Sequence, residues 1–187
     1  THSFEGLDMD GEWELAPDLA NYKKSGWRVD IGEMHYMLPE PADMEGKLRA
    51  MGVDNGDLVV IVAGGVSPGA LDLGAATRVY WTLKAMGHDE VSILDGGMKA
   101  WTDAGYAVTA EATPIVPGDF NAELNASIIA DGDMAAAAIE GPVELIDSRP
   151  SAQFTADVQP GYARNPGTIK SAVNLPAPSL VGEGGFG

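Results

Sequence analysis

Between Pro39 and Ala104, short uncharged runs alternate with segments in which apolar residues recur at helical spacing. LVVIVA at 58–63 and VSIL at 91–94 are the runs, and they predict strands that are buried on both faces of a sheet. Helical patterns occupy the segment PADMEGKLRAMGV, which ends at Gly52, the segment of roughly 71–86, which ends at Gly87, and 98–104. Strands and helices that alternate with short loops predict an α/β fold with a parallel sheet covered by helices.

The regions on either side of this pattern are less regular. Residues 1–38 show no clear period, which predicts irregular surface polypeptide, and 109–127 carries two prolines and few periodic apolar residues, which predicts a linker. Beyond it, DMAAAAIE predicts a helix of small residues, VELID at 143–147 a strand, and 168–176 a short strand before the flexible ending SLVGEGGFG. This second unit is too small to close a hydrophobic core unaided.

The composition favours a soluble globular protein, and the net charge argues against some classes of binding partner. The chain has 187 residues, 45% of them hydrophobic, and its apolar runs stop well short of the ~20 residues of a membrane span. Its first residues do not resemble a signal peptide, and nothing indicates a compartment. Asp and Glu number 28 against 11 Lys and Arg, a net charge of −17, which argues against nucleic acid or an anionic membrane as partner. An acidic solubilising surface explains the charge better than cation binding.

The loop after the first strand, AGGVSPG, is placed to cradle an anion but fits no phosphate-loop signature. It has no lysine for a Walker A loop, and the glycines do not follow the dinucleotide spacing G-x-G-x-x-G. The chain has no cysteine, which excludes a thiol nucleophile or a thiolate metal site within it. Its three histidines are far apart, so we expect no metal site, and His88 has a structural role after the helix that ends near Gly87. The aromatic residues Tyr80, Trp81 and Trp101 are expected in the core.

Three segments resemble the tandem-domain thiosulfate or 3-mercaptopyruvate sulfurtransferases. ILDGGMKAWTDAGYAV, with ATRVYWTLKAMGHDEVSI before it, is similar to the closing strand and helix of a rhodanese-like domain. VELIDSRPSAQF resembles the opening strand with its Asp-x-Arg signature, and NPGTIKSAVNLP resembles the family segment Gly-His-Ile-Pro-Gly-Ala-x-Asn-x-Pro. The likeness extends from Met37 to Pro176.

This resemblance implies tandem domains, each with a five-stranded parallel sheet flanked by helices. Residues 1–115 would be a non-catalytic first domain whose N-terminal part is missing or divergent, and 116–187 the start of a second domain. A cysteine outside this chain would take sulfane sulfur as a persulfide, from an anionic donor such as thiosulfate or 3-mercaptopyruvate. It would pass the sulfur to cyanide or a thiol, without a cofactor. The chain itself, having no cysteine, is expected to be inactive.

The resemblance also assigns residues. Ala63 or Gly64 occupies the nucleophile position of the first domain, so the anion loop there belongs to a domain that is not catalytic. The anion loop consists of Gly64, Gly65, Val66 and Ser67. Structural roles fall to the turn of Asp95, Gly96 and Gly97 and to Asp147, which would pair with Arg149. Arg149 and Arg164 are the candidates for binding the anionic donor.

Some residues depart from the family, and other interpretations stay open. Gln153 stands where active relatives often have an arginine, and Thr168 and Lys170 replace the histidine and proline of the usual Gly-His-Ile-Pro segment. One alternative function is a non-catalytic rhodanese-like module that binds an anion or a protein, and a weaker one is a nucleotide-binding α/β domain. An alternative fold is a single permuted sheet that contains the strands near 58, 91, 143 and 168.

Overall fold

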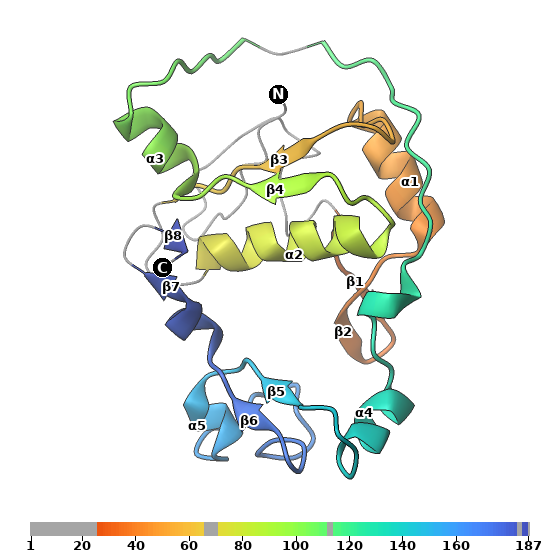
Figure 1. Ribbon diagram of the computed structural model, residues 1–187, viewed down its shortest axis with the longest axis vertical. Helices are drawn as coiled ribbons and strands as arrows, with labels where there is room; N and C mark the ends of the chain where they lie inside the picture. The colour runs from red at the N-terminus through yellow and green to blue at the C-terminus, as the bar shows by residue number, and fades with distance from the viewer. Residues whose placement is uncertain (1–25, 66–70, 112–113, 183–184, 187) are drawn as a thin grey trace. The chain divides into compact units, whose positions relative to one another are not determined.

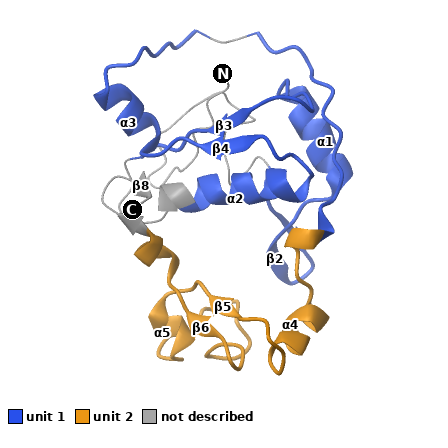
Figure 2. Cartoon of the chain, in the orientation of Figure 1, with its two compact units in different colours: residues 1–126 blue, residues 127–187 orange. Residues whose placement is uncertain are grey.

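The computed structural model describes residues 26–65, 71–111, 114–182 and 185–186 (Figure 1). The chain divides into two compact units, Thr1–Ala126 and Ser127–Gly187 (Figure 2). The expected domains, residues 1–115 and 116–187, are a separate matter from these compact units. That the two units correspond to two rhodanese-like domains stays a prediction.

Unit 1 is built around the parallel strands β3 (Val59–Ile61) and β4 (Val91–Ile93), which helix α2 (Leu71–Ala85) connects. Val59 pairs with Val91 and Ile61 with Ile93, and helix α1 (Pro41–Ala50) contributes Met44 and Leu48 to the core. The two strands and both helices were predicted from the apolar pattern, with bounds that differ by a few residues. The buried core consists of Trp27, Met44, Leu48, Met51, Val53, Val59, Ile61, Ala76, Val79, Leu83, Met86, Val91 and Phe120.

Helix α3 (Gly97–Asp103) forms where the sequence predicted a short helix, but its tryptophan is not in the core. Trp101 is 38% exposed, packs against Tyr106 and donates its indole N–H to the carbonyl of Ala107 at 3.0 Å. The expectation that it is a core residue was wrong, because this helix presents the ring to the chain segment that follows it. Tyr80, by contrast, packs partly buried against the core.

Residues expected to be irregular instead form an antiparallel hairpin of β1 (Val29–Ile31) and β2 (Met34–Met37). Gly32 makes the turn with φ of 60°, a conformation that glycine adopts without steric cost. Every residue of β2 is exposed, so the strand lacks the alternation of buried and exposed positions that reveals a strand in sequence.

Residues 118–125, which we name the docked segment, are not a free linker. The backbone N–H groups of Gly118, Phe120 and Asn125 donate to the carbonyls of Arg49, Val53 and Ala85, at 2.8, 3.1 and 2.8 Å. Phe120 is 1% exposed and belongs to the core of unit 1. The linker prediction is therefore wrong for this segment.

Unit 2 contains short helices and short strands. Helix α4 (Gly132–Ala138) starts at Asp131, whose carboxylate accepts a hydrogen bond from the N–H of Met134 at 2.8 Å, a standard N-cap. Strands β5 (Ile146–Asp147) and β6 (Val173–Asn174) pair in parallel, and α5 (Ser151–Phe154) follows β5. The remaining elements are η1 (Ala126–Ile128), η2 (Ala177–Leu180), β7 (Val181–Gly182) and β8 (Gly185–Phe186).

The five-stranded sheets implied by the resemblance are not confirmed in the described residues. Each parallel sheet there has two strands, β3 with β4 and β5 with β6. Because these two pairs belong to separate sheets, the structure does not support the alternative of one permuted sheet.

Candidate functional site

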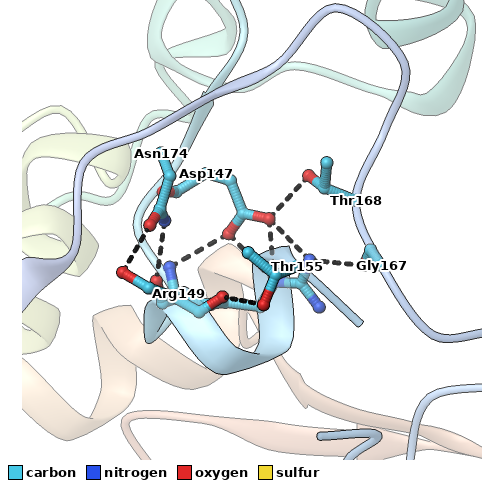
Figure 3. Close-up of polar contacts among 7 residues, drawn as sticks. Asp147, Arg149, Thr155, Gly167, Thr168 and Asn174 are labelled. Carbon is cyan, nitrogen blue, oxygen red and sulfur yellow. Dashed lines mark hydrogen bonds and ion pairs between the residues drawn. The ribbon is translucent and has the colours of Figure 1, made fainter. Parts of the chain in front are cut away.

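The candidate site in unit 2 is centred on the ion pair of Asp147 and Arg149, where β5 ends (Figure 3). Nε of Arg149 lies 2.9 Å from Oδ1 of Asp147, and its Nη2 lies 2.5 Å from Oδ2. The backbone N–H of Arg149 donates to Oδ1 as well, at 3.0 Å. The Asp147 side chain is 8% exposed and that of Arg149 33% exposed, so the pair is largely shielded from water. A two-pronged contact of this kind fixes the direction of the guanidinium group.

Three further residues connect this pair to segments distant in the sequence. Thr168 donates its hydroxyl to Oδ2 of Asp147 at 2.6 Å, and Arg149 donates to the carbonyl of Gly167 at 2.8 Å (Figure 3). The side-chain amide of Asn174 donates to the backbone carbonyls of Asp147 and Arg149, both at 2.9 Å. The network thereby ties the end of β5 to β6 and to the loop that precedes it.

The network shifts the protonation equilibria of its two charged members. Hydrogen bonding to Arg149 is the main reason that the pKa of Asp147 lies well below its usual range, and the hydrogen bond from Thr168 lowers it further. The same pairing raises the pKa of Arg149. Asp147 is therefore ionised at any pH near neutrality, and it acts here as an acceptor of hydrogen bonds, not as a proton donor.

The other residues that the sequence brought forward in unit 2 have these contacts in the structure. Lys170 pairs with Glu140 at 3.0 Å, and both side chains are more than three-quarters exposed, at 77% and 79%. Arg164 is exposed, and its carbonyl accepts a hydrogen bond from the side chain of Gln159 at 3.3 Å. Gln153 lies on α5 with a buried Oε1 that has no hydrogen-bond partner in the described part of the chain. The roles of Arg149 and Arg164 in binding a donor stay predictions.

In unit 1, the end of β3 is interlocked with the turn before α3. The carbonyl of Ala63 accepts a hydrogen bond from the N–H of Met98 at 2.7 Å, and that of Gly64 accepts one from Lys99 at 3.0 Å. A Cβ on Gly65 would stand 2.1 Å from the carbonyl oxygen of Gly96. The two loops therefore approach so closely that only glycine fits at the contact.

This contact involves the Asp95–Gly97 turn, to which the sequence analysis gave a structural role. Gly96 and Gly97 have φ of 70° and 60°, and a Cβ on Gly97 would lie 2.3 Å from the carbonyl oxygen of Ala63. Of the expected anion loop, Gly64 and Gly65 are described, whereas Val66 and Ser67 lie outside the described residues. The anion-binding role of this loop therefore stays a prediction.

Other kinds of site find little support in the described residues. These residues contain no group of three or more His, Asp or Glu side chains that could hold a metal ion. Among them, no helix is long and apolar enough to cross a membrane. His88 is 3% exposed and packs edge-on against Phe120 with ring centroids 5.5 Å apart. This contact and the hydrogen bonds of Asn174 and Gly167 leave no local pattern in the sequence, because each joins residues far apart in the chain.

Comparison with known proteins identifies the fold. Residues 30–104 match the family model described as Rhodanese-like domain. Residues 30–104 are a rhodanese-like domain. The chain is similar in structure to the crystal structure of SseA from Escherichia coli, a 3-mercaptopyruvate sulfotransferase, with a TM-score of 0.68 and 30% identity over 81% of this chain and 55% of that one. The rhodanese fold predicted from the sequence is thereby confirmed.

The chain also resembles curated sulfurtransferases. It is 33% identical to the 3-mercaptopyruvate sulfurtransferase of Escherichia coli over 153 residues, which is 80% of this chain and 52% of the relative. It is 31% identical to the thiosulfate sulfurtransferase of Bos taurus over 155 residues, 80% of this chain and 50% of the relative. The chain thus spans about half the length of these relatives.

Proposed function

We propose that these residues belong to a tandem sulfurtransferase that moves sulfane sulfur from thiosulfate or 3-mercaptopyruvate to cyanide or a thiol. In this proposal unit 1 is a non-catalytic domain and unit 2 begins the catalytic one. The observation that supports it is that the similarity to the Escherichia coli enzyme extends beyond unit 1. Unit 1 is 126 of 187 residues, about two thirds, whereas the match to the Escherichia coli enzyme covers 80% of the chain. The match therefore continues into the unit that holds Asp147 and Arg149.

The proposed reaction uses a cysteine outside these 187 residues. Its thiolate attacks the outer sulfur of thiosulfate, the S–S bond breaks and sulfite leaves with the electron pair. With 3-mercaptopyruvate the C–S bond breaks, and the carbon fragment leaves as pyruvate after it takes up a proton. The persulfide then gives its terminal sulfur to cyanide, which yields thiocyanate and regenerates the thiolate. Backbone N–H groups that converge on the sulfur would stabilise the thiolate and the persulfide.

Within this scheme, the contacts of Arg149 favour a structural role over substrate binding. Its Nε and Nη2 are both occupied by Asp147, and Nη2 also donates to Gly167. A guanidinium that is held on two sides fixes the loop at the end of β5, and the carboxylate of Asp147 offsets its positive charge toward an anionic donor. Arg164, which is exposed, is the better candidate for attracting the donor.

Unit 1 is expected to have no catalytic role in this reaction. The position expected for the nucleophile in this unit is that of Ala63 or Gly64, and neither residue has a reactive side chain. Their carbonyls accept hydrogen bonds from the N–H groups of Met98 and Lys99 in the first turn of α3, so the loop joins the end of β3 to α3.

A turnover assay on the longer protein tests the proposal. We expect thiocyanate from thiosulfate and cyanide, or pyruvate from 3-mercaptopyruvate, and loss of both when the cysteine of the second domain is replaced by serine. The 187-residue chain is the matched control and should give neither product. A longer protein that folds but turns over neither donor would favour the alternative, a rhodanese-like module that binds an anion or a protein without catalysis.

A further inference from the structure

Asn55 and Gly56 form the centre of a tight turn that leads into β3. The N–H of Asp57 donates to the carbonyl of Asp54 at 3.2 Å, and the N–H of Asp54 donates to the Asp57 carboxylate at 2.9 Å. These two hydrogen bonds define a β-turn with Asn55 and Gly56 as its central residues. Asn55 is the only asparagine of the chain that a glycine follows.

The side-chain amide of Asn55 connects this turn to the docked segment. Its Nδ2 donates to the backbone carbonyl of Asp119 at 3.2 Å, and its Oδ1 accepts a hydrogen bond from the N–H of Asn121 at 2.8 Å. The carboxylate of Asp119 lies 3.4 Å from the same Nδ2. Both polar atoms of the amide are therefore held by the residues on either side of Phe120, which belongs to the core.

An asparagine that precedes a glycine has a reactivity of its own, because glycine leaves its backbone nitrogen unhindered. That nitrogen can attack Cγ of the asparagine and lose its proton, while the bond from Cγ to the amide nitrogen breaks and ammonia leaves. Water then opens the resulting succinimide ring at either of its carbonyls, which gives aspartate or isoaspartate. The net reaction is the hydrolysis of an amide, so water is the one co-reactant.

We propose that Asn55 is a site of spontaneous deamidation, and that the docked segment both slows this reaction and is loosened by it. The segment slows it because the side chain must leave Asp119 and Asn121 before Cγ can turn to the nitrogen of Gly56. In the product, the donor to the Asp119 carbonyl is lost, and a new negative charge lies beside the Asp119 carboxylate. Isoaspartate also adds a carbon atom to the backbone of the turn. The change is one-way, since ammonia is lost.

Peptide mapping of the 187-residue chain after incubation at neutral pH measures the reaction. Trypsin cuts after Arg49 and Arg78, and the peptide between them contains Asn55 as its one asparagine. We expect the mass of this peptide to shift from amide to carboxylate at least about tenfold more slowly in the folded chain than in guanidinium chloride, because the folded chain must first release the docked segment. The peptide that carries Asn121 and Asn125, each followed by alanine, should keep its mass.

The variant Gly56→Ala tests the chemical origin of the change. A Cβ at this position meets nothing within 4 Å, so the turn should keep its structure, but the added methyl group crowds the attacking nitrogen. In guanidinium chloride the variant should therefore deamidate at least about tenfold more slowly than the wild type.

The variant Asn55→Asp carries the aspartate product from the start. We expect the amide of Phe120, which donates to the carbonyl of Val53 at 3.1 Å, to exchange with solvent at least about tenfold faster in this variant. Asn121→Asp is the matched control, because it adds the same charge to the docked segment and leaves the Asn55 amide in place. It should change the exchange of Phe120 by less than about threefold.

Three results would overturn the proposal. If Asn55 keeps its amide in guanidinium chloride as long as Asn121 does, the turn is not a site of deamidation. Equal rates in the folded and the unfolded chain would show that the docked segment does not protect the amide. Unchanged exchange of Phe120 in Asn55→Asp would show that the reaction does not loosen the segment. None of these measurements depends on sulfur transfer by the longer protein.

Discussion

The docked segment makes a quantitative prediction, because its anchor, Phe120, fills the core of unit 1. The ring is 1% exposed and packs against His88, and Arg49 holds the backbone carbonyl of Phe120 at 2.7 Å. Truncating a buried phenylalanine to alanine typically costs about 3–5 kcal/mol, from lost burial and the cavity that remains. We expect Phe120→Ala to lower the unfolding free energy of unit 1 by about 3 kcal/mol, near the lower end because the segment lies at the surface and can partly collapse.

Denaturant unfolding followed by tryptophan fluorescence measures this change, since Trp27 is buried in the same core. Val116→Ala is the control: Val116 is 80% exposed in the chain just before the docked segment, and its loss should change the free energy by less than about 0.5 kcal/mol. If Phe120→Ala costs less than about 1 kcal/mol, the segment is not part of the core, and the linker expected from the sequence is the better description.

Three further predictions concern the loops, the ion pair and the surface. Gly97→Ala places a Cβ 2.3 Å from the carbonyl oxygen of Ala63 at a φ of 60°, so it should destabilise unit 1 by at least about 2 kcal/mol in thermal unfolding, whereas Gly56→Ala, which meets open space, should be neutral. Asp147→Asn should destabilise the longer protein by about 2 kcal/mol at neutral pH by leaving Arg149 without its charged partner. The lowered pKa of Asp147 means that the ionised carboxylate contributes fully above about pH 4, and the difference between wild type and variant should shrink as pH falls below that value in acid titration. Because the net charge is −17, the melting temperature of unit 1 should rise between 0.1 M and 1 M KCl, and no change would show that repulsion among the acidic groups does not limit stability.

The helices and strands of unit 1 were predictable where apolar residues and glycines form a regular pattern within a short segment. Val59 and Ile61 of the predicted strand are buried, and α2 ends within two residues of Gly87, whose φ is 84°. The expected burial of this strand on both faces was wrong, because Val60, which points to the other face, is 37% exposed. The pair of Asp147 and Arg149 was also predictable, since the two residues stand two positions apart within the Asp-x-Arg signature. What made these predictions succeed is that burial and spacing within about ten residues determine the outcome.

The misses share a different cause. The docked segment is held by Asn55, whose N–H donates to Asp119 at 3.2 Å across 64 positions of sequence, and by Phe120, an isolated aromatic in a polar stretch. Nothing local distinguishes this stretch from a loose linker. Asn174 and Thr168 reach Asp147 across 27 and 21 positions, so their part in the network appears only in the structure.

Intact mass of the longer protein after treatment with thiosulfate tests the central claim most directly. The account predicts a gain of one sulfur atom, mapped by peptide analysis to a cysteine outside these 187 residues and removed by cyanide. The 187-residue chain, which has no cysteine, should gain none. A longer protein that is folded and contains a free cysteine, but gains no sulfur from thiosulfate or 3-mercaptopyruvate, would contradict the assignment as a sulfurtransferase.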